Sequence, residues 1–174
     1  NIYTAGKSSA TWGSPVRAYT GSDDAFVAKI NSSGALVWNT FLGGSGSDIN
    51  RAIVLSINGN IYIAGNSSAT WGSPVRAYSG SIDAFIARLN SSGVILWNAF
   101  FGSSDVIDYG VSVVLDNSGN VYLGGQSSAT WGSPVRAYSG NGDAFIVKLS
   151  DDSSPPLCSN FSPTSGSTIT DHTP

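Results

Sequence analysis

A stretch of twelve residues, present three times without a change, constrains the fold of this chain more than any other feature. It reads Ser-Ser-Ala-Thr-Trp-Gly-Ser-Pro-Val-Arg-Ala-Tyr and occupies residues 8–19, 67–78 and 127–138. The equivalent residues Asn1, Asn60 and Asn120 lie 59 and 60 positions apart. Repeats of this length form whole supersecondary units, which bury their apolar surface by stacking on one another. The chain is therefore expected to be a tandem array of similar units.

The composition favours strands and tight turns over helices. Of the 174 residues, 21 are Gly, 41% are hydrophobic and only 11% are charged. All 11 acidic residues are Asp, and Asp suits turns and strand ends better than helix interiors. We therefore expect an all-β fold.

Charge and hydropathy argue against two classes of partner. The formal net charge is -3, and the 8 Lys and Arg residues form no run that could neutralise phosphates. No apolar segment approaches the roughly 20 residues that a membrane-spanning helix needs. The sequence therefore predicts neither nucleic acid as a partner nor a membrane span.

The second repeat shows the expected strands most clearly. Residues 51–57 are rich in β-formers, and Asn58-Gly59 after them predicts a hairpin with a type I′ turn. Further strands are expected at 61–65, 83–89 and 94–101. Each full repeat is thus predicted to be a four-stranded antiparallel meander.

The strand predicted at 83–89 has two apolar faces. Phe85, Ala87 and Leu89 fall on one face, and Ala84 and Ile86 fall on the other. A sheet of this kind must be covered on both sides. Four-stranded sheets repeated around an axis are the blades of a β-propeller, which we favour over an open β-solenoid because solenoid coils are usually much shorter.

Three motifs resemble the SBBP repeat, a seven-bladed β-propeller family of bacterial and archaeal surface proteins. They are Asn-Ile-Tyr-Ile-Ala-Gly at 60–65, Asp-Ala-Phe-Val-Ala-Lys-Ile at 24–30 and Trp-Asn-Thr-Phe-Leu-Gly-Gly-Ser-Gly-Ser-Asp at 38–48. The resemblance covers residues 1 to about 150 and implies an extracellular or cell-surface propeller without enzymatic activity. The Trp-Gly-Ser-Pro segment departs from the family, whose repeats often carry Phe-Pro there.

The expected strands number ten, or two and a half blades, over residues 1–152. The units are 1–59, 60–119 and 120–152, followed at 153–174 by a Pro/Ser-rich linker or arm, or the start of a β-sandwich module. Because propellers need four to eight blades, two explanations remain open. Either further blades lie outside these residues, or neighbouring chains supply the missing strands and complete a ring or filament.

The connection that carries the invariant stretch, roughly residues 7–23 and its two copies, is longer than most loops and is the best candidate site. Its aromatic and Arg side chains could stack on sugar rings or contact a protein partner. Alternatively, they anchor the loop to the sheets, which is the interpretation that we favour. The candidate residues are Trp12, Arg17, Tyr19, Trp71, Arg76, Tyr78, Trp131, Arg136 and Tyr138.

Other chemistry is sparse in the sequence. Four Asn-x-Ser sequences could accept a glycan, although two of them fall where turns favour Asn in any case. They begin at Asn31, Asn66, Asn90 and Asn160. Cys158 and His172, the only residues of their kinds, give neither a catalytic pair nor a metal site. No cofactor, metal or catalytic residue is predicted.

These observations predict a non-enzymatic extracellular structural or adhesive module. Its expected partners are copies of itself or further blades of the same protein. The alternative is a carbohydrate-binding module that uses the Trp, Arg and Tyr side chains of the three long loops.

Overall fold

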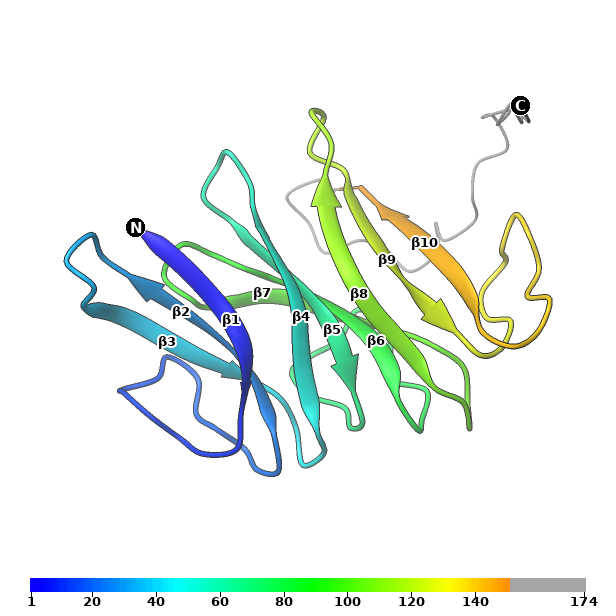
Figure 1. Ribbon diagram of the computed structural model, residues 1–174, viewed down its shortest axis with the longest axis horizontal. Helices are drawn as coiled ribbons and strands as arrows, with labels where there is room; N and C mark the ends of the chain where they lie inside the picture. The colour runs from blue at the N-terminus through cyan, green and yellow to red at the C-terminus, as the bar shows by residue number, and fades with distance from the viewer. Residues whose placement is uncertain (151–174) are drawn as a thin grey trace.

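The computed structural model describes residues 1–150, which form ten strands in three antiparallel sheets and contain no helix (Figure 1). The first sheet has the order β1-β2-β3, the second β4-β5-β6-β7 and the third β10-β9-β8. The expected tail at 153–174, with Asn160, Cys158 and His172, lies outside the described residues. The strands are β1 (Ile2–Ser8), β2 (Asp24–Ile30), β3 (Leu36–Leu42), β4 (Asp48–Leu55), β5 (Ile61–Ser67), β6 (Asp83–Leu89), β7 (Ile95–Phe101), β8 (Asp108–Leu115), β9 (Val121–Ser127) and β10 (Asp143–Leu149).

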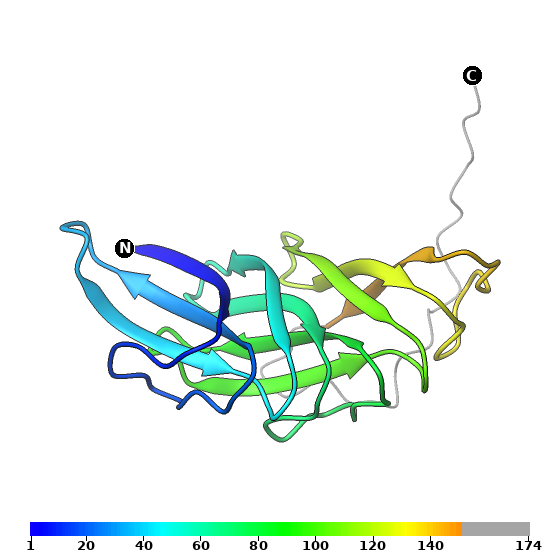
Figure 2. The same ribbon diagram turned by 60° about the horizontal axis from the view of Figure 1, so that its bottom comes forward.

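Each sheet is the meander that the sequence predicted. The second sheet is a complete four-stranded blade, whereas residues 1–150 supply the first with no counterpart of β4 and the third with no counterpart of β7. The three sheets follow one another across the molecule in chain order (Figures 1 and 2). The fold is therefore all-β, with about two and a half propeller-type blades in the described residues.

The β4–β5 hairpin forms where it was predicted, but its turn is of another type. The N–H of Gly59 donates to the carbonyl of Ser56 at 3.0 Å, and Gly59 alone in the turn has a positive φ, of 78°. A type I′ turn would need positive φ at both central residues, so that prediction was wrong. The geometry is that of a three-residue loop, in which Gly takes the left-handed position after an ordinary turn.

The two apolar faces of the central sheet are both buried, as predicted from the apolar residues on either face of 83–89. Phe85, Ala87 and Leu89 of β6 belong to a core that β1, β2 and β3 close from the other side. Ala84 and Ile86 belong to a second core, closed by β8, β9 and β10. All residues of β5 and β6 are buried as a result. Each core is thus shared between two neighbouring repeats, as in other repeat arrays.

Phe85 offers a test of the shared core, since its side chain is completely buried between the first and second sheets. We expect Phe85→Ala to lower the free energy of unfolding by about 3 to 5 kcal/mol, because it removes apolar contacts and leaves a cavity. Urea denaturation measures this loss. Ile57→Ala is the control, since Ile57 is fully exposed in a turn and should change stability by less than about 0.5 kcal/mol. Equal losses in the two variants would contradict the shared core.

Candidate functional site

The three connections that carry the invariant stretch, here called the Trp loops, span residues 9–23, 68–82 and 128–142. They lie at the same end of the sheets as the β3–β4 and β7–β8 connections (Figure 1). Parallel bridges join the loop ends to these connections, Asp23 to Ser47 and Ile82 to Ile107. The Trp loop of one repeat therefore meets the strand that begins the next repeat.

The tryptophans fold back onto the sheets. Trp71 is only 4% exposed and packs edge-on against Phe85 and Phe100, with ring centroids 5.3 and 5.6 Å apart. Trp12 packs in the same way against the equivalent phenylalanines of the first sheet. Trp131 packs against Phe145 of its own sheet. Edge-to-face pairs of this kind add to the burial energy of the rings.

The arginines bind the last strand of their own sheet. Arg17 donates from Nη1 to the carbonyl of Phe41 at 3.0 Å and from Nη2 to that of Gly43 at 2.7 Å. Arg76 donates in the same way to Phe100 and, at 3.2 Å, to Gly102. The guanidinium of Arg76 also lies over the ring of Trp131, 5.4 Å from its centroid, and so connects two repeats.

The tyrosines close the far end of each loop. The hydroxyl of Tyr19 donates to the carbonyl of Ser22, and that of Tyr78 to the carbonyl of Ser81 at 2.6 Å. Ser22 and Ser81 both have a φ of 60°, a region in which residues other than glycine are strained. The tyrosine hydroxyls therefore help to hold two left-handed loop residues in place.

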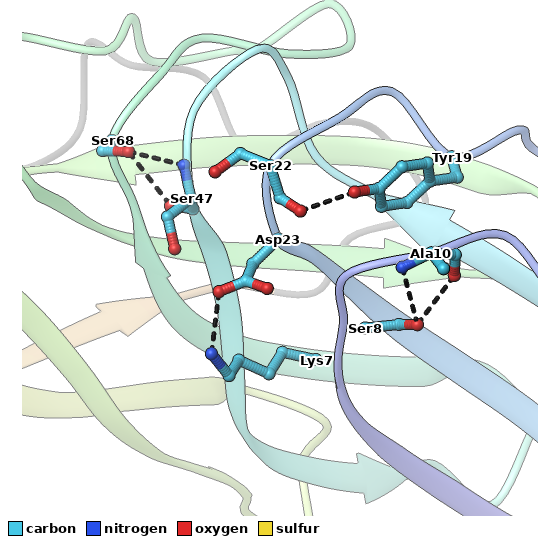
Figure 3. A network of polar contacts seen from close by, with 8 residues as sticks. All are labelled: Lys7, Ser8, Ala10, Tyr19, Ser22, Asp23, Ser47 and Ser68. Atoms are coloured by element: carbon cyan, nitrogen blue, oxygen red, sulfur yellow. Dashed lines mark hydrogen bonds and ion pairs between the residues drawn. The ribbon is translucent and has the colours of Figure 1, made fainter.

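Figure 3 shows the junction of the first and second repeats from close by. Ser8 Oγ donates to the carbonyl of Ala10, which fixes the start of the Trp loop. Lys7 pairs with Asp23 at 2.7 Å, and Ser47 donates its N–H to Ser68 Oγ at 2.7 Å. An exposed ion pair of this kind contributes at most about 1 kcal/mol. The Ser47–Ser68 bond extends the pairing of β4 with β5, while the N–H of Asp48 donates to the carbonyl of Asp23 at 2.7 Å and so joins the first repeat to the second.

The contacts in the first two loops match the anchoring interpretation. Trp71 and the two arginines turn their binding groups toward the protein itself. The third loop differs, because Arg136 is exposed and hydrogen-bonds to no residue within 1–150, while Tyr138 and Trp131 remain half-buried. A ligand-binding role for the nine residues stays a prediction.

Two pairs of buried carboxylates lie where repeats meet, and the sequence analysis did not single out this pairing. Asp24 Oδ1 and Asp48 Oδ2 lie 2.5 and 2.8 Å from the point where a Cβ on Gly43 would stand. Asp83 and Asp108 surround Gly102 in the same way. The signal in the sequence was the recurrence of Gly, then Asp five or six residues later, after each Trp-Asn segment.

Each carboxylate is partly satisfied by its own repeat. Asp48 accepts hydrogen bonds from the Ser67 hydroxyl and from Gly44 N–H, the latter at 2.8 Å. Asp24 accepts two from Thr20 through Oδ2, while its Oδ1 has no hydrogen-bond partner within residues 1–150. Burial raises the pKa of Asp48 above its ordinary value, and the charge of Asp24 adds to this. Two close carboxylates away from water oppose each other's ionisation.

Arg17 lies near the first carboxylate pair. Burial lowers the pKa of Arg17, whereas the charges of Asp24 and Asp48 act in the opposite direction. In the second pair, burial likewise raises the pKa of Asp83, with a further increase from Asp108 and a decrease from Arg76. Gly43 and Gly102 permit the close approach of the carboxylates, because any side chain there would collide with them. All four carboxylates are completely buried where neighbouring repeats meet.

The possible glycan acceptors differ in accessibility. Asn31 and Asn90 sit in turns, where their Oδ1 atoms accept hydrogen bonds from the backbone N–H groups of Ser33 and Ser92. Asn66 is 5% exposed and accepts a hydrogen bond from Arg51. Among these three, only the turn positions leave room for a glycan.

Neither the family models nor the curated proteins compared with this chain match it, so the resemblance to SBBP repeats stays a prediction. Within residues 1–150, no three His, Cys, Asp or Glu side chains gather where they could hold a metal ion. The same residues include no helix that is long and apolar enough to span a membrane.

The carboxylate pairs predict the pH dependence of stability. Because the pKa values of Asp48 and Asp83 are raised in the folded state, these groups hold protons more tightly when folded. Their contribution to stability is complete below the unfolded value of about 4 and is lost as the pH rises through the folded values. We therefore expect the melting temperature to increase on acidification from about pH 7 toward 4.

The double variant Asp48→Asn, Asp83→Asn should flatten this dependence, because neither amide titrates. Asp105→Asn is the matched control, since Asp105 is an exposed carboxylate in the β7–β8 connection. Thermal unfolding followed by circular dichroism at several pH values measures the effect. A wild-type chain whose stability falls between pH 7 and about 5 would show the assignment to be wrong.

Proposed function

We propose that this chain is a non-enzymatic, extracellular structural or adhesive module of the β-propeller type. Its repeats stack on further repeats, and copies of the chain assemble head to tail into a ring or filament, with strands of one copy completing sheets of the next. In such an assembly, the outer faces of the first and third repeats pack in the same way as the faces that join the three repeats to one another.

The observation that carries the proposal is a contrast between equivalent residues. Ile86 of the second repeat is fully buried against the third, and Val27 of the first is fully buried against the second. Ile146 occupies the same position in the third repeat and is 78% exposed. This position is buried wherever a following repeat is present, and within residues 1–150 no repeat follows the third.

The opposite face of the array shows the same contrast. Ile61 is fully buried against the first repeat, whereas the equivalent Ile2 is 61% exposed. Leu36 is 43% exposed, although its equivalent, Ile95, packs into the core between the first two sheets. The two outer faces thus carry complementary halves of one interface. Surfaces of this kind join head to tail, which gives a ring where the rotation closes and a filament where it does not.

The carbohydrate-binding alternative has less support. Sugar rings stack on exposed aromatic faces, but Trp71 is 4% exposed and Trp12 and Trp131 are half-buried against phenylalanines. A glycan array probed with the wild-type chain tests this alternative, with Trp131→Ala as the comparison. Specific glycan binding that Trp131→Ala abolishes would favour it over the structural role.

The proposed assembly is tested by sedimentation velocity over a range of protein concentrations. We expect the wild-type chain to form species larger than one chain, because exposed apolar residues on both outer faces are covered when copies stack. Ile146→Asp should shift the chain to the monomer, since a carboxylate would be buried without a partner at the contact. Ile57→Asp is the control, because Ile57 is equally apolar and fully exposed in a turn.

A wild-type chain that stays monomeric and folded at every concentration would overturn self-assembly. Assembly that Ile146→Asp leaves intact would show that another surface is responsible.

A further inference from the structure

The Trp loop of the second repeat clasps the outer edge of β7. The N–H of Val75 donates to the carbonyl of Asn98 at 2.9 Å, and the N–H of Phe100 donates to the carbonyl of Arg76 at 3.1 Å. Asn98 donates from Nδ2 to the carbonyl of Trp71 at 3.0 Å. The loop therefore covers a strand edge that would otherwise be open.

The Trp loop of the first repeat makes the equivalent contacts with β3. Val16 donates to Asn39 at 2.8 Å, Phe41 donates to Arg17 at 3.1 Å, and Asn39 Nδ2 donates to Trp12 at 2.8 Å. The two Arg side chains add the carbonyl contacts described above. What the loop recognises is thus a strand with the pattern Trp-Asn-x-Phe-x-Gly, which occurs at 38–43 and 97–102.

The third Trp loop carries the same invariant stretch and shares local features with the other two, without such a strand within residues 1–150. Gly132 has a φ of 65°, as Gly13 does, and Ser127 Oγ donates to the carbonyl of Ala129 as in the other copies. Trp131 stands over Phe145 with ring centroids 5.0 Å apart. These local features are therefore present in the third loop although no strand of residues 1–150 is bound to it.

The groups that would hold the strand are exposed in this third copy. Val135 is 84% exposed, against 46% for its equivalent, Val16. Arg136 is exposed, whereas Arg17 and Arg76 are half-buried. β10 pairs with β9 on one side only among the described strands. A strand edge and a loop that fit the same strand thus lie side by side, and no strand within residues 1–150 occupies them.

We propose that the open edge of β10, together with Val135 and Arg136, is a docking site for an extended segment with the pattern Trp-Asn-x-Phe-x-Gly. A further repeat of the same kind, lying outside this chain and with its own copy of the pattern unpaired, supplies the segment, because both copies within this chain are already paired in β3 and β7. The inference rests on the proposed stacking on further repeats and names the strand that the third repeat receives. The mode of binding is strand addition, in which main-chain bonds give affinity and side-chain contacts give specificity.

The register of the docked segment follows from the two occupied copies. Phe26 faces Phe41 and Phe85 faces Phe100 across the ladder, so the incoming Phe stands opposite Phe145. By the same equivalence, the incoming Asn stands opposite Val147 and the incoming Trp opposite Lys148. Arg136 then donates to the carbonyls of the Phe and the Gly.

The test is a peptide with the sequence of residues 94–103, carrying a fluorophore and two added lysines for solubility. Titrated with the full chain, it should bind saturably, as measured by fluorescence anisotropy. A peptide with its Asn replaced by Leu is the matched control and should bind more weakly, because it loses the bond to the carbonyl of Trp131. Equal binding of a scrambled peptide would overturn the site.

Two chain variants locate the binding. Arg136→Ala should weaken it about tenfold or more, because two hydrogen bonds from a charged donor are lost. Arg51→Ala is the control and should bind like the wild type, since Arg51 contacts Asn66 and Tyr109, away from β10. Failure of the peptide to bind, or full binding by Arg136→Ala, would overturn the proposal.

Hydrogen exchange distinguishes docking from strand exchange. Docking protects the amides of β10 and of residues 134–137, whereas replacement of β3 or β7 changes protection in β2 or β6 and would contradict the site. Peptide binding without assembly of the chain would overturn the proposed function and leave this site standing. Assembly without peptide binding would overturn this site and leave the proposed function standing.

Discussion

The structure depends on sheets that are apolar on both faces. A strand such as β6, which buries Phe85 toward one neighbour and Ile86 toward the other, cannot be stable in a single sheet surrounded by water. Each repeat therefore needs a neighbour on either side, and the second repeat, which has both, is the best buried of the three. The exposed residues of the outer repeats follow directly from this requirement.

The Trp loops cover the outer strand edge of the first and second sheets. Instead of leaving the edge of β3 or β7 open, the loop of the same repeat reaches it with main-chain bonds and an arginine. The Trp, Arg and Tyr side chains resemble a ligand site in the sequence. In two of the three copies they instead anchor the loop to its own sheet. That task explains why the stretch is long and why it needs both aromatic and charged anchors.

Much of this could be predicted from the sequence. The apolar residues on both faces of 83–89 predicted two buried faces, and the repeated segments predicted all ten strands, because short-range pattern determines which way side chains point. The type of turn at Asn58-Gly59 was predicted wrongly, since one extra residue in the hairpin changes which position needs a positive φ. The pairing of Asp24 with Asp48 depends on contacts between repeats, so the recurring Gly and Asp mark the residues but do not show that the two carboxylates meet.

The central claim is that every face of these sheets is made to be covered by another repeat. Electron microscopy of the particles that the chain forms tests it most directly, because it shows what lies against the first and third repeats. The account predicts discs, tubes or fibres in which sheets follow one another at about 10 Å with no bare outer face. Isolated single chains, with the side of Ile146 open to solvent, would contradict it.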